Sequence, residues 1–435
     1  MQTHFSPDLL ADPDMAQSEK ILRACVHCGF CTATCPTYLL TGDELDSPRG
    51  RIYLIKDMLE NDRPADARVA RHVDRCLSCL SCMTTCPSSV HYMHLVDHAR
   101  AHIETTYRRP LFDRLLRAAL AVTLTRPALF RWSLRGAALA RPFARLLPKR
   151  IAALVDMAPA HLPPPSPVDR PQVFPAQAPR RMRVALLSGC AQTVLDTRIN
   201  EAAVRLLTRL GAEVVIAKGA GCCGALPHHL GRADESHALA RRNIDAWTRE
   251  IEAGGLDHIV VDTSGCGTTV KDYGHMFRDD VALAGEAARI AAMARDITEV
   301  VADLGAAPRV DVGGLRVAYH SACSLQHGQK IADAPMDLLR GSGFDVVPVP
   351  EGHICCGSAG TYNLLQSELA SELRARKVAN IERVAPQAIA AGNLGCMIQI
   401  GQGTAIPILH TIELIDWACG GPRPAALDDG RAERA

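Results

Sequence analysis

The sequence predicts a mixed α + α/β protein, with an all-helical N-terminal domain followed by two pseudo-symmetric α/β lobes. Three observations lead to this prediction. Eight cysteines near the N-terminus repeat with one spacing, and the residues between the two copies have helical periodicity. A basic stretch and a proline-rich stretch then separate this region from the rest of the chain. Beyond them, a longer repeat alternates strand and helix patterns twice, which is typical of open, largely parallel sheets.

Composition limits the setting in which the chain works. Its 435 residues are enough for two or three domains, and its net charge of +1 gives no indication of nucleic-acid binding. The first residues are polar and acidic, so we expect no secretion signal, and no apolar run is long enough to span a bilayer. We therefore expect a cytoplasmic protein, peripheral at most on the cytoplasmic face of the inner membrane. In that reducing compartment its 17 cysteines are expected to be metal ligands or redox groups.

The N-terminal cysteine motif predicts two iron–sulfur clusters. Residues 25–36 read CVHCGFCTATCP and residues 76–87 read CLSCLSCMTTCP, both with the spacing C-x2-C-x2-C-x3-C-P. In two-cluster ferredoxins the fourth cysteine of such a motif ligates the other cluster. The predicted ligands are Cys25, Cys28, Cys31 and Cys86 for the first [4Fe–4S] cluster, and Cys76, Cys79, Cys82 and Cys35 for the second. A pair of zinc sites is the alternative, but zinc needs only two C-x2-C pairs per site, so the spacing fits it poorly.

The residues between the two motifs are expected to be helical rather than the short hairpins of a compact ferredoxin. Ser47 can cap a helix whose first residue is Pro48, and apolar side chains then recur on one face over residues 52–59. Residues 1–107 are therefore predicted to form an all-helical two-cluster ferredoxin domain. This domain resembles the C-terminal half of succinate dehydrogenase iron–sulfur subunits.

Two segments of biased composition follow. Residues 108–150 contain eleven Arg or Lys and one acid among apolar residues, and predict a basic helical connector over residues 108–158. Such a surface could lie on anionic lipid, dock on an acidic partner, or remain a solvated connector packed on the ferredoxin domain. Eight prolines within residues 159–179 predict an extended linker over residues 159–180. Residues 421–435 are expected to form a disordered tail.

The longer repeat relates residues 181–305 to residues 306–420, which we call CCG lobes 1 and 2. RVALLSGC ends at Cys190, and RVAYHSAC ends 133 residues later at Cys323. After 31 intervening residues each copy has a vicinal cysteine pair followed by glycine, and each later supplies one more cysteine. The lobe cysteines are Cys190, Cys222, Cys223 and Cys266, and Cys323, Cys355, Cys356 and Cys396. They follow predicted strands, where open α/β sheets place their sites, so they form a candidate extra metal site.

The chemistry of the lobe cysteines has several interpretations. Adjacent cysteines can reach different irons of a further iron–sulfur cluster, which we favour, whereas an isolated cysteine is commonly a buried apolar residue. A pocket that cycles between dithiol and disulfide is the competing interpretation. Four histidines lie near these cysteines in the sequence, and each is expected to be a loop or core residue: His228, His229, His320 and His353. Residues 219–224, GAGCCG, match a dinucleotide fingerprint but follow the second strand of the lobe, so nucleotide binding is not expected.

Several stretches resemble the iron–sulfur subunits of glycolate oxidase, also called glycolate dehydrogenase. They include ILRACVHCGFCTATCPTY, GDELDSPRGRIYLIK, GCCGALPHHL, SLQHGQK and HICCGSAGTY, and the resemblance covers nearly the whole chain except residues 108–180. The CCG repeats are also similar to those of heterodisulfide reductase subunits. Those proteins have C-x2-C late in each lobe, whereas Thr263 and Asn393 stand three residues before Cys266 and Cys396 here. Four cysteines per lobe remain.

The resemblance implies an electron-transfer subunit of a glycolate dehydrogenase complex. In that family an FAD-containing subunit oxidises glycolate to glyoxylate, and the iron–sulfur subunit passes the electrons to a quinone or another respiratory acceptor. A flavin is needed in the partner because a 2-hydroxy acid yields two electrons as a hydride, while iron–sulfur clusters take them singly. Three alternatives remain open: the same role with lactate or glycerol 3-phosphate, catalysis of disulfide or quinone reduction by the CCG lobes, and a scaffold with structural clusters.

Overall fold

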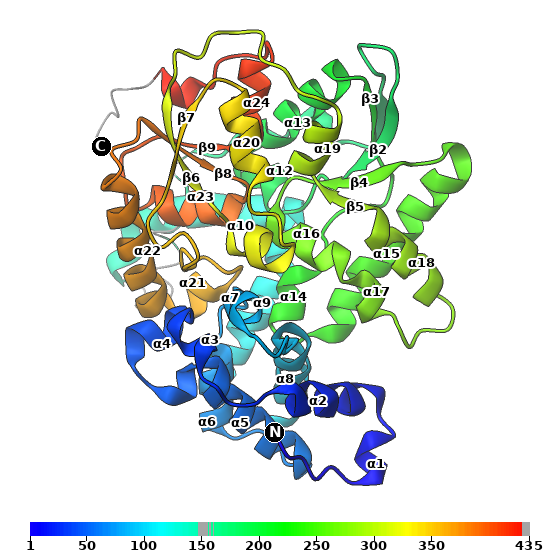
Figure 1. Ribbon diagram of the computed structural model, residues 1–435, viewed down its shortest axis with the longest axis vertical. Helices are drawn as coiled ribbons and strands as arrows, with labels where there is room; N and C mark the ends of the chain where they lie inside the picture. The colour runs from blue at the N-terminus through cyan, green and yellow to red at the C-terminus, as the bar shows by residue number, and fades with distance from the viewer. Residues whose placement is uncertain (147–154, 156–157, 160, 429–435) are drawn as a thin grey trace.

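The computed structural model describes residues 1–146, 155, 158–159 and 161–428. Its N-terminal domain is built from helices and loops (Figure 1). No strand occurs in residues 1–107, all of which are described. This confirms the predicted all-helical domain. Its helices are α1 (Pro7–Leu10), α2 (Pro13–Ala24), α3 (Phe30–Ala33), α4 (Pro36–Thr41), the 3-10 helix η1 (Glu44–Asp46), α5 (Pro48–Glu60), α6 (Ala67–Asp74), α7 (Ser81–Thr85) and α8 (Tyr92–Thr106).

Helix α5 forms as its sequence predicts. The Ser47 hydroxyl accepts a hydrogen bond from the Gly50 amide at 3.0 Å, and Pro48 is the first helical residue. Ile52 and Ile55 are 3% and 0% exposed, and they belong to the apolar core of this domain. Full burial of such a side chain contributes about 1.5–3 kcal/mol. Helix α5 therefore packs on α2 and α8, in the chain between the two cysteine motifs.

The basic segment folds into helices whose cations are partly internal. It contains α9 (Leu111–Leu124), α10 (Pro127–Ala140) and the 3-10 helix η2 (Arg141–Leu146). Arg109 and Arg117 are buried, and both donate to the Asp74 carboxylate, at 2.6 and 2.8 Å. Charge-assisted hydrogen bonds of this kind are among the stronger ones, so these arginines attach the segment to the ferredoxin domain. Residues 147–154 and 156–157 of the predicted connector lie outside the described residues.

The proline-rich segment is only partly extended. It contains the 3-10 helix η3 (Pro167–Asp169) and strand β1 (Gln172–Phe174), and β1 pairs antiparallel with β3 at the edge of a sheet. The buried Arg131 of α10 donates to the Thr193 carbonyl at 2.9 Å and to the Pro163 carbonyl. The segment is therefore held between α10 and lobe 1, and its last strand extends the sheet of that lobe.

Lobe 1 alternates strands and helices as predicted. Its elements are β2 (Met182–Leu186), α12 (Gln192–Leu195), α13 (Arg198–Arg209), β3 (Ala212–Ile216), α14 (Ala225–His229), α15 (Ala233–Gly254), β4 (His258–Val261), α16 (Ser264–Lys271), α17 (Tyr273–Met276), α18 (Ala284–Met293), β5 (Ala294–Asp296) and α19 (Ile297–Asp303). The strand order is β1-β3-β2-β4-β5, and all pairs except β1 with β3 are parallel.

Lobe 2 repeats this topology. Its elements are β6 (Arg316–His320), the π-helix η4 (Ser324–Gly328), α20 (Ala334–Gly341), β7 (Asp345–Pro348), α21 (Tyr362–Leu365), α22 (Ser367–Glu382), β8 (Ala388–Ala391), α23 (Leu394–Gly401), β9 (Ile408–His410), α24 (Thr411–Ala418) and the 3-10 helix η5 (Ala425–Leu427). The parallel order β7-β6-β8-β9 matches the order β3-β2-β4-β5 of lobe 1. The two lobes therefore share one strand order, which confirms the predicted pseudo-symmetry.

The C-terminal segment after α24 differs in part from the expected tail. Ala426 and Leu427 of η5 pack against the core that the two lobes share, so this part of the segment is not a free tail. Residues 429–435 lie outside the described residues.

The two lobes share a continuous apolar core. It includes Leu186 and Val260 from the first sheet and Tyr319 and Leu409 from the second. Helix α13 of lobe 1 packs on α24 of lobe 2. In the same way α20, the counterpart of α13 in lobe 2, packs on α19, the counterpart of α24 in lobe 1. This reciprocal packing makes the lobes one body rather than two separable units.

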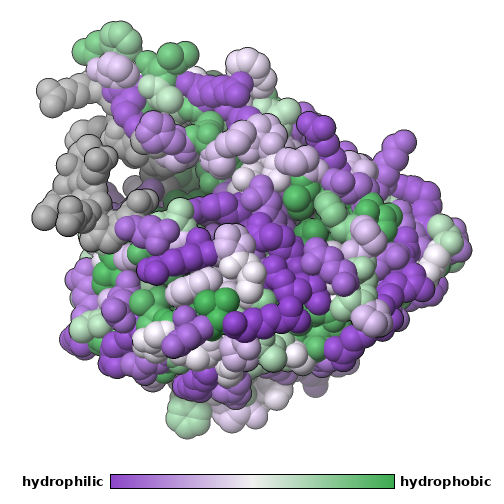
Figure 2. Space-filling model, turned by 90° about the horizontal axis from the view of Figure 1, so that it is seen from above, coloured by the Kyte–Doolittle hydropathy of each residue, from purple (hydrophilic) through white to green (hydrophobic). Residues whose placement is uncertain are grey.

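The ferredoxin domain lies at one end of this body, below both lobes in Figure 1. Helix α8 contacts α14 of lobe 1, where His228 Nε2 lies 3.2 Å from the buried Asp97 carboxylate. Thr84 in α7 bonds to His327 in η4 of lobe 2 at 2.8 Å. The opposite end of the molecule is covered mainly by hydrophilic side chains, with scattered apolar ones (Figure 2). Among the described residues, no helix combines the length and apolar character needed to cross a membrane.

Candidate metal centres

The duplicated cysteine motif folds into two loops of the same shape. His27 and Ser78 occupy equivalent positions and have positive φ angles of 56° and 47°. Gly29 and Leu80, which are also equivalent, have φ angles of 87° and 61°. The left-handed region is unfavourable for residues with a Cβ atom, and such strain is typical of functional sites. The short helices α3 and α7 that follow the loops pack on each other, which brings the end of each motif to the other loop.

A first hollow is lined by the cysteines that the crossed pattern assigns to the first cluster. Three cysteines of the first motif and Cys86 of the second line it, together with Cys82. Cys28 is exposed, while Cys31 and Cys86 are half-buried, so this hollow opens to solvent. Burial raises the pKa of the Cys31 thiol to about 11. A set of four thiols around one opening fits the ligand requirement of a [4Fe–4S] cluster.

A second hollow is lined by the cysteines assigned to the second cluster. Cys35, Cys76, Cys79 and Cys82 line it, and all four are buried. Burial raises the pKa of the Cys79 and Cys82 thiols well above its ordinary value, because a thiolate loses its hydration there and neighbouring cysteines repel it. Positively charged iron would offset that cost, so these residues also fit a [4Fe–4S] cluster. Cys82 borders both hollows, which places them side by side.

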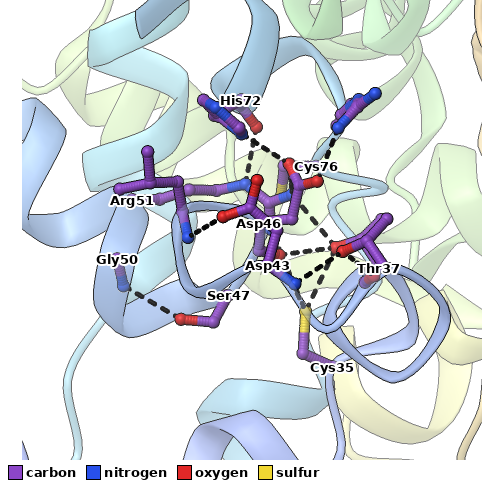
Figure 3. Close-up of polar contacts among 12 residues, drawn as sticks. Cys35, Thr37, Asp43, Asp46, Ser47, Gly50, Arg51, His72 and Cys76 are labelled. Carbon is purple, nitrogen blue, oxygen red and sulfur yellow. Dashed lines mark hydrogen bonds and ion pairs between the residues drawn. The ribbon is translucent and has the colours of Figure 1, made fainter. Parts of the chain in front are cut away.

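Arg51 lines the second hollow and places a buried positive charge there. Figure 3 shows its polar contacts with its neighbours. Its side chain is 1% exposed; Nε donates to the His72 carbonyl at 2.6 Å, and Nη1 lies 3.9 Å from Cys35 Sγ. The buried Asp46 carboxylate accepts from His72 Nδ1 at 2.8 Å and from Arg75 at 2.7 Å, and lies 3.7 Å from Arg51. Since charge and hydrogen bonds near the sulfurs set the reduction potential of a cluster, this network is positioned to tune it.

The four cysteines of lobe 1 come together as the repeat predicts. The side chains of Cys190 and Cys222, of Cys222 and Cys223, and of Cys223 and Cys266 lie close enough to shift one another's pKa. The contacts with Cys190 and Cys223 lower the pKa of Cys222 well below its ordinary value, while those same contacts and burial raise the pKa of its neighbours. Four thiols this close cannot all ionise unless a cation neutralises them.

The four cysteines of lobe 2 also come together, and they adjoin the second hollow. Cys323 Sγ lies 3.8 Å from Cys355 Sγ, and the sulfurs of Cys356 and Cys396 lie within 4.8 Å of each other. Cys355 and Cys79 belong to one apolar cluster, which also includes Leu77 and Tyr362. The cysteines of lobe 2 are therefore the neighbours of the second ferredoxin motif.

Thr263 and Asn393, which replace a cysteine of the heterodisulfide reductase pattern, make hydrogen bonds instead. Thr263 Oγ1 donates to Gln192 of lobe 1. Asn393 caps α23 by accepting from the Cys396 amide at 3.2 Å, and its Nδ2 donates to Ser264 Oγ of the other lobe at 3.0 Å. These side chains hold the loops and the lobe interface in place.

The histidines near the lobe cysteines divide into two groups. His228 and His229 lie in α14 and approach Asp97 of the ferredoxin domain, so they are domain contacts rather than the expected loop or core residues. The His353 carbonyl, in the loop after β7, accepts from His327 at 3.2 Å within lobe 2. His320 is a core residue, as expected, but it lies beside Cys356 and Cys396, a proximity that the sequence pattern does not predict. Alignment of the two repeats could have indicated it, because lobe 1 has the apolar Leu187 at the position of His320, and both residues are buried at the end of a strand. Burial and Lys377 lower the pKa of His320 to about 3.

Comparison with protein families defines the class. Residues 21–90 match the family described as a 4Fe-4S dicluster domain. Residues 184–271 and 317–401 each match the family described as a cysteine-rich domain. The chain is thus an iron–sulfur protein with a two-cluster domain and two cysteine-rich lobes.

Comparison with individual proteins identifies the particular family. The chain is 40% identical to the glycolate oxidase iron-sulfur subunit of Escherichia coli (strain K12) over 96% of its own length and 99% of that protein. It is 30% identical to the probable glycolate oxidase iron-sulfur subunit of Bacillus subtilis (strain 168), over 88% and 89% of the two chains. The chain belongs to the family of glycolate oxidase iron–sulfur subunits, which confirms the resemblance described above.

Two more distant matches are a relative that aligns with about half of this chain and a solved structure with a similar fold. Lactate utilization protein A of Bacillus licheniformis is 29% identical over 54% of this chain and 99% of that protein. The crystal structure of a hypothetical protein from Helicobacter pylori aligns with a TM-score of 0.55 at 10% identity, covering 96% of this chain and 74% of that one. The latter supports the fold alone.

Proposed function

We propose that this chain is the iron–sulfur electron-transfer subunit of a glycolate-oxidising complex, and that it passes electrons from a flavin-containing subunit to a respiratory acceptor. The observation that carries the proposal is the pair of adjoining, thiol-lined hollows, one open to solvent and one buried against lobe 2. The relatives named as glycolate oxidase iron-sulfur subunits support glycolate as the substrate of the complex.

In this proposal the ligands cross between the two motifs. Cys25, Cys28, Cys31 and Cys86 hold the first [4Fe–4S] cluster, and Cys76, Cys79, Cys82 and Cys35 hold the second. The bound clusters accept and release single electrons. The chain's own residues position them, shield the second from water, and place the Arg51 charge next to it.

The partner carries the flavin. Glycolate loses two electrons as a hydride, which a flavin can accept and then release singly to clusters. The first hollow is the place where a partner's cofactor can come closest, because Cys28 is exposed there. Val26 and Phe30 beside it are 66% and 61% exposed, an apolar surface suited to a protein contact.

Reconstitution with the flavin subunit tests the substrate. We expect the purified complex to contain flavin, and its clusters to be reduced by glycolate more rapidly than by lactate or glycerol 3-phosphate. Absorbance of the clusters under anaerobic conditions measures this directly. Faster reduction by lactate would favour the role suggested by the lactate utilization relatives, which match about half of this chain. Reduction by none of the three would refute a 2-hydroxy-acid or glycerol-phosphate role.

We also propose that the CCG lobes hold bound metal in addition to the two ferredoxin clusters. Replacing Cys222 and Cys223 with Ser should lower the metal content of anaerobically purified protein while the ferredoxin clusters keep roughly eight irons. The physical reason is that the two residues contribute half of the thiols gathered in lobe 1. Elemental analysis and the spectra of the ferredoxin clusters provide the measurement. Unchanged metal with loss of acceptor reduction would instead indicate a dithiol–disulfide pocket.

The basic segment is proposed to hold the complex at the anionic cytoplasmic face of the inner membrane. Its helices expose Leu115, Trp132 and Leu139 at 58%, 67% and 79%. Cations and apolar side chains on one surface favour anionic lipid, and salt should weaken the contact.

Liposome flotation tests this surface. Changing the exposed Arg114, Arg126 and Arg135 to Glu should abolish flotation with anionic vesicles. Arg131 and Arg117 are left intact because they are buried and bonded within the protein. The matched control changes three exposed arginines elsewhere to Glu: Arg68, Arg71 and Arg289. Equal flotation of both variants would leave only a connector or subunit-docking role.

A further inference from the structure

Lobe 2 contains a buried histidine whose ring nitrogens have no hydrogen-bond partner. His320 is the last residue of β6 and is 1% exposed. Neither Nδ1 nor Nε2 is hydrogen-bonded. Leaving a buried polar group unpaired is energetically costly, so such an arrangement usually has a reason.

The imidazole faces two cysteine sulfurs. One ring nitrogen of His320, Cys356 Sγ and Cys396 Sγ all lie within 4.8 Å of one another, and all three residues are buried. They come from three separate elements: the end of β6, the loop after β7, and the first turn of α23. The cap that Asn393 provides to the Cys396 amide fixes the third of these. A neutral imidazole with thiolates is a donor set that binds zinc and iron well.

We propose that lobe 2 holds a metal centre in which His320 is a ligand together with Cys356 and Cys396. The donors form a mixed imidazole–thiolate site for a thiophilic metal. The same donor set can bind a single divalent ion or one iron of an iron–sulfur cluster. This inference deepens the proposal that the lobes bind metal, and it does not depend on which substrate the complex oxidises.

Lobe 1 does not offer the same donors. The residue equivalent to His320 is Leu187, which is 2% exposed and belongs to the apolar core around Cys223. The cysteines otherwise match one for one, so the two lobes differ at this ligand position. The centre of lobe 2 is therefore chemically distinct from any all-thiolate centre in lobe 1. Because Cys355 adjoins Cys79, the distinct centre lies on the side of the second ferredoxin hollow.

The surroundings of the site balance its charge. Lys377 is 1% exposed, and its ammonium donates to the Glu351 carbonyl at 3.0 Å. It also interacts electrostatically with Cys356 and the other three cysteines of the lobe. A buried cation offsets part of the negative charge that thiolate ligands bring, which lowers the cost of placing the centre in the interior.

Metal analysis of the full chain tests the assignment. We compare wild type with His320→Gln, Cys396→Ser and the matched control His353→Gln, which changes a nearby histidine outside the three-residue set. His320→Gln and Cys396→Ser should each lower the metal bound outside the ferredoxin clusters, by about one equivalent for a single ion or about four irons for a cluster. His353→Gln should retain it. His320→Cys should also retain it, because a thiolate replaces the imidazole, which controls for misfolding.

X-ray absorption supplies a readout that a structural role would not change. The wild-type spectrum of this centre should contain a nitrogen scatterer at about 2.0–2.1 Å beside sulfur at about 2.3 Å, and His320→Cys should lose the nitrogen. If Cys396→Ser lost metal while His320→Gln kept the wild-type metal content, His320 would not be a ligand, although the lobe would still bind metal. If neither variant lowered the metal content, both the inference and the proposed metal in lobe 2 would be wrong.

Discussion

Replacing Cys86 with Ala is expected to remove the cluster held by the first motif, not the one held by its own motif. The reason is geometric: Cys86 lines the first hollow with Cys25, Cys28 and Cys31, whereas Cys35 lines the second. Iron should fall from roughly eight to roughly four per ferredoxin domain, apart from any metal in the lobes. Electron paramagnetic resonance of the reduced protein identifies the surviving cluster.

Two reference variants assign each electron paramagnetic resonance signal to its cluster, whether or not the ligands cross between the motifs. Cys25→Ala removes a ligand that belongs to the first cluster with or without crossing, and Cys76→Ala does the same for the second. The Cys86→Ala spectrum should match that of Cys25→Ala, and the Cys35→Ala spectrum should match that of Cys76→Ala. The reverse pairing would show that each motif closes its own cluster.

Replacing Arg51 with Met is expected to lower the reduction potential of the second cluster. Removing a positive charge makes the added electron less stable, and Arg51 is fully buried beside Cys35. A unit charge at about 6 Å with an effective dielectric of about 20 is worth about 3 kcal/mol, on the order of 100 mV for one electron. The variant should also lose about 1–3 kcal/mol of stability, because the His72 carbonyl loses its buried donor while Asp46 keeps His72 and Arg75.

Two further substitutions separate charge from structure. Arg51→Lys keeps the charge and should restore most of the potential, though not all of the hydrogen bonds. Arg75→Met removes another partner of Asp46, one that is 20% exposed, and should shift the potential less. Redox titration of each variant measures the effect. An unchanged potential in Arg51→Met would mean that the charge does not act on the cluster.

Local sequence signals predicted the elements that depend on nearby residues. Ser47 and Pro48 start α5 as expected, and the repeat around Cys190 and Cys323 yields two sheets of one topology. Such features depend on capping and periodicity, which a short window contains. The approach of Arg51 to Cys35 was not predictable, because it depends on how α5 packs against the start of α4.

Long-range contacts also explain the remaining differences. The composition of the basic segment predicts cations that face lipid, a partner or solvent, but Arg131 bonds to the carbonyl of Thr193, 62 residues away. Strand β1 lies in a proline-rich stretch and exists because β3 offers it an edge. His320 looked like an ordinary core histidine, since its proximity to Cys356 and Cys396 arises only when three separate elements meet.

The most direct test of the account follows electrons in the assembled complex. Glycolate is mixed anaerobically with the chain bound to its flavin subunit, and the [4Fe–4S] signals are followed by freeze-quench electron paramagnetic resonance. The account predicts that the clusters are reduced within one turnover and reoxidised when acceptor is added. In Cys86→Ala the flavin should still be reduced, while electron delivery to the acceptor is lost. Clusters that stay oxidised during turnover, or unimpaired delivery in that variant, would contradict the electron-transfer role.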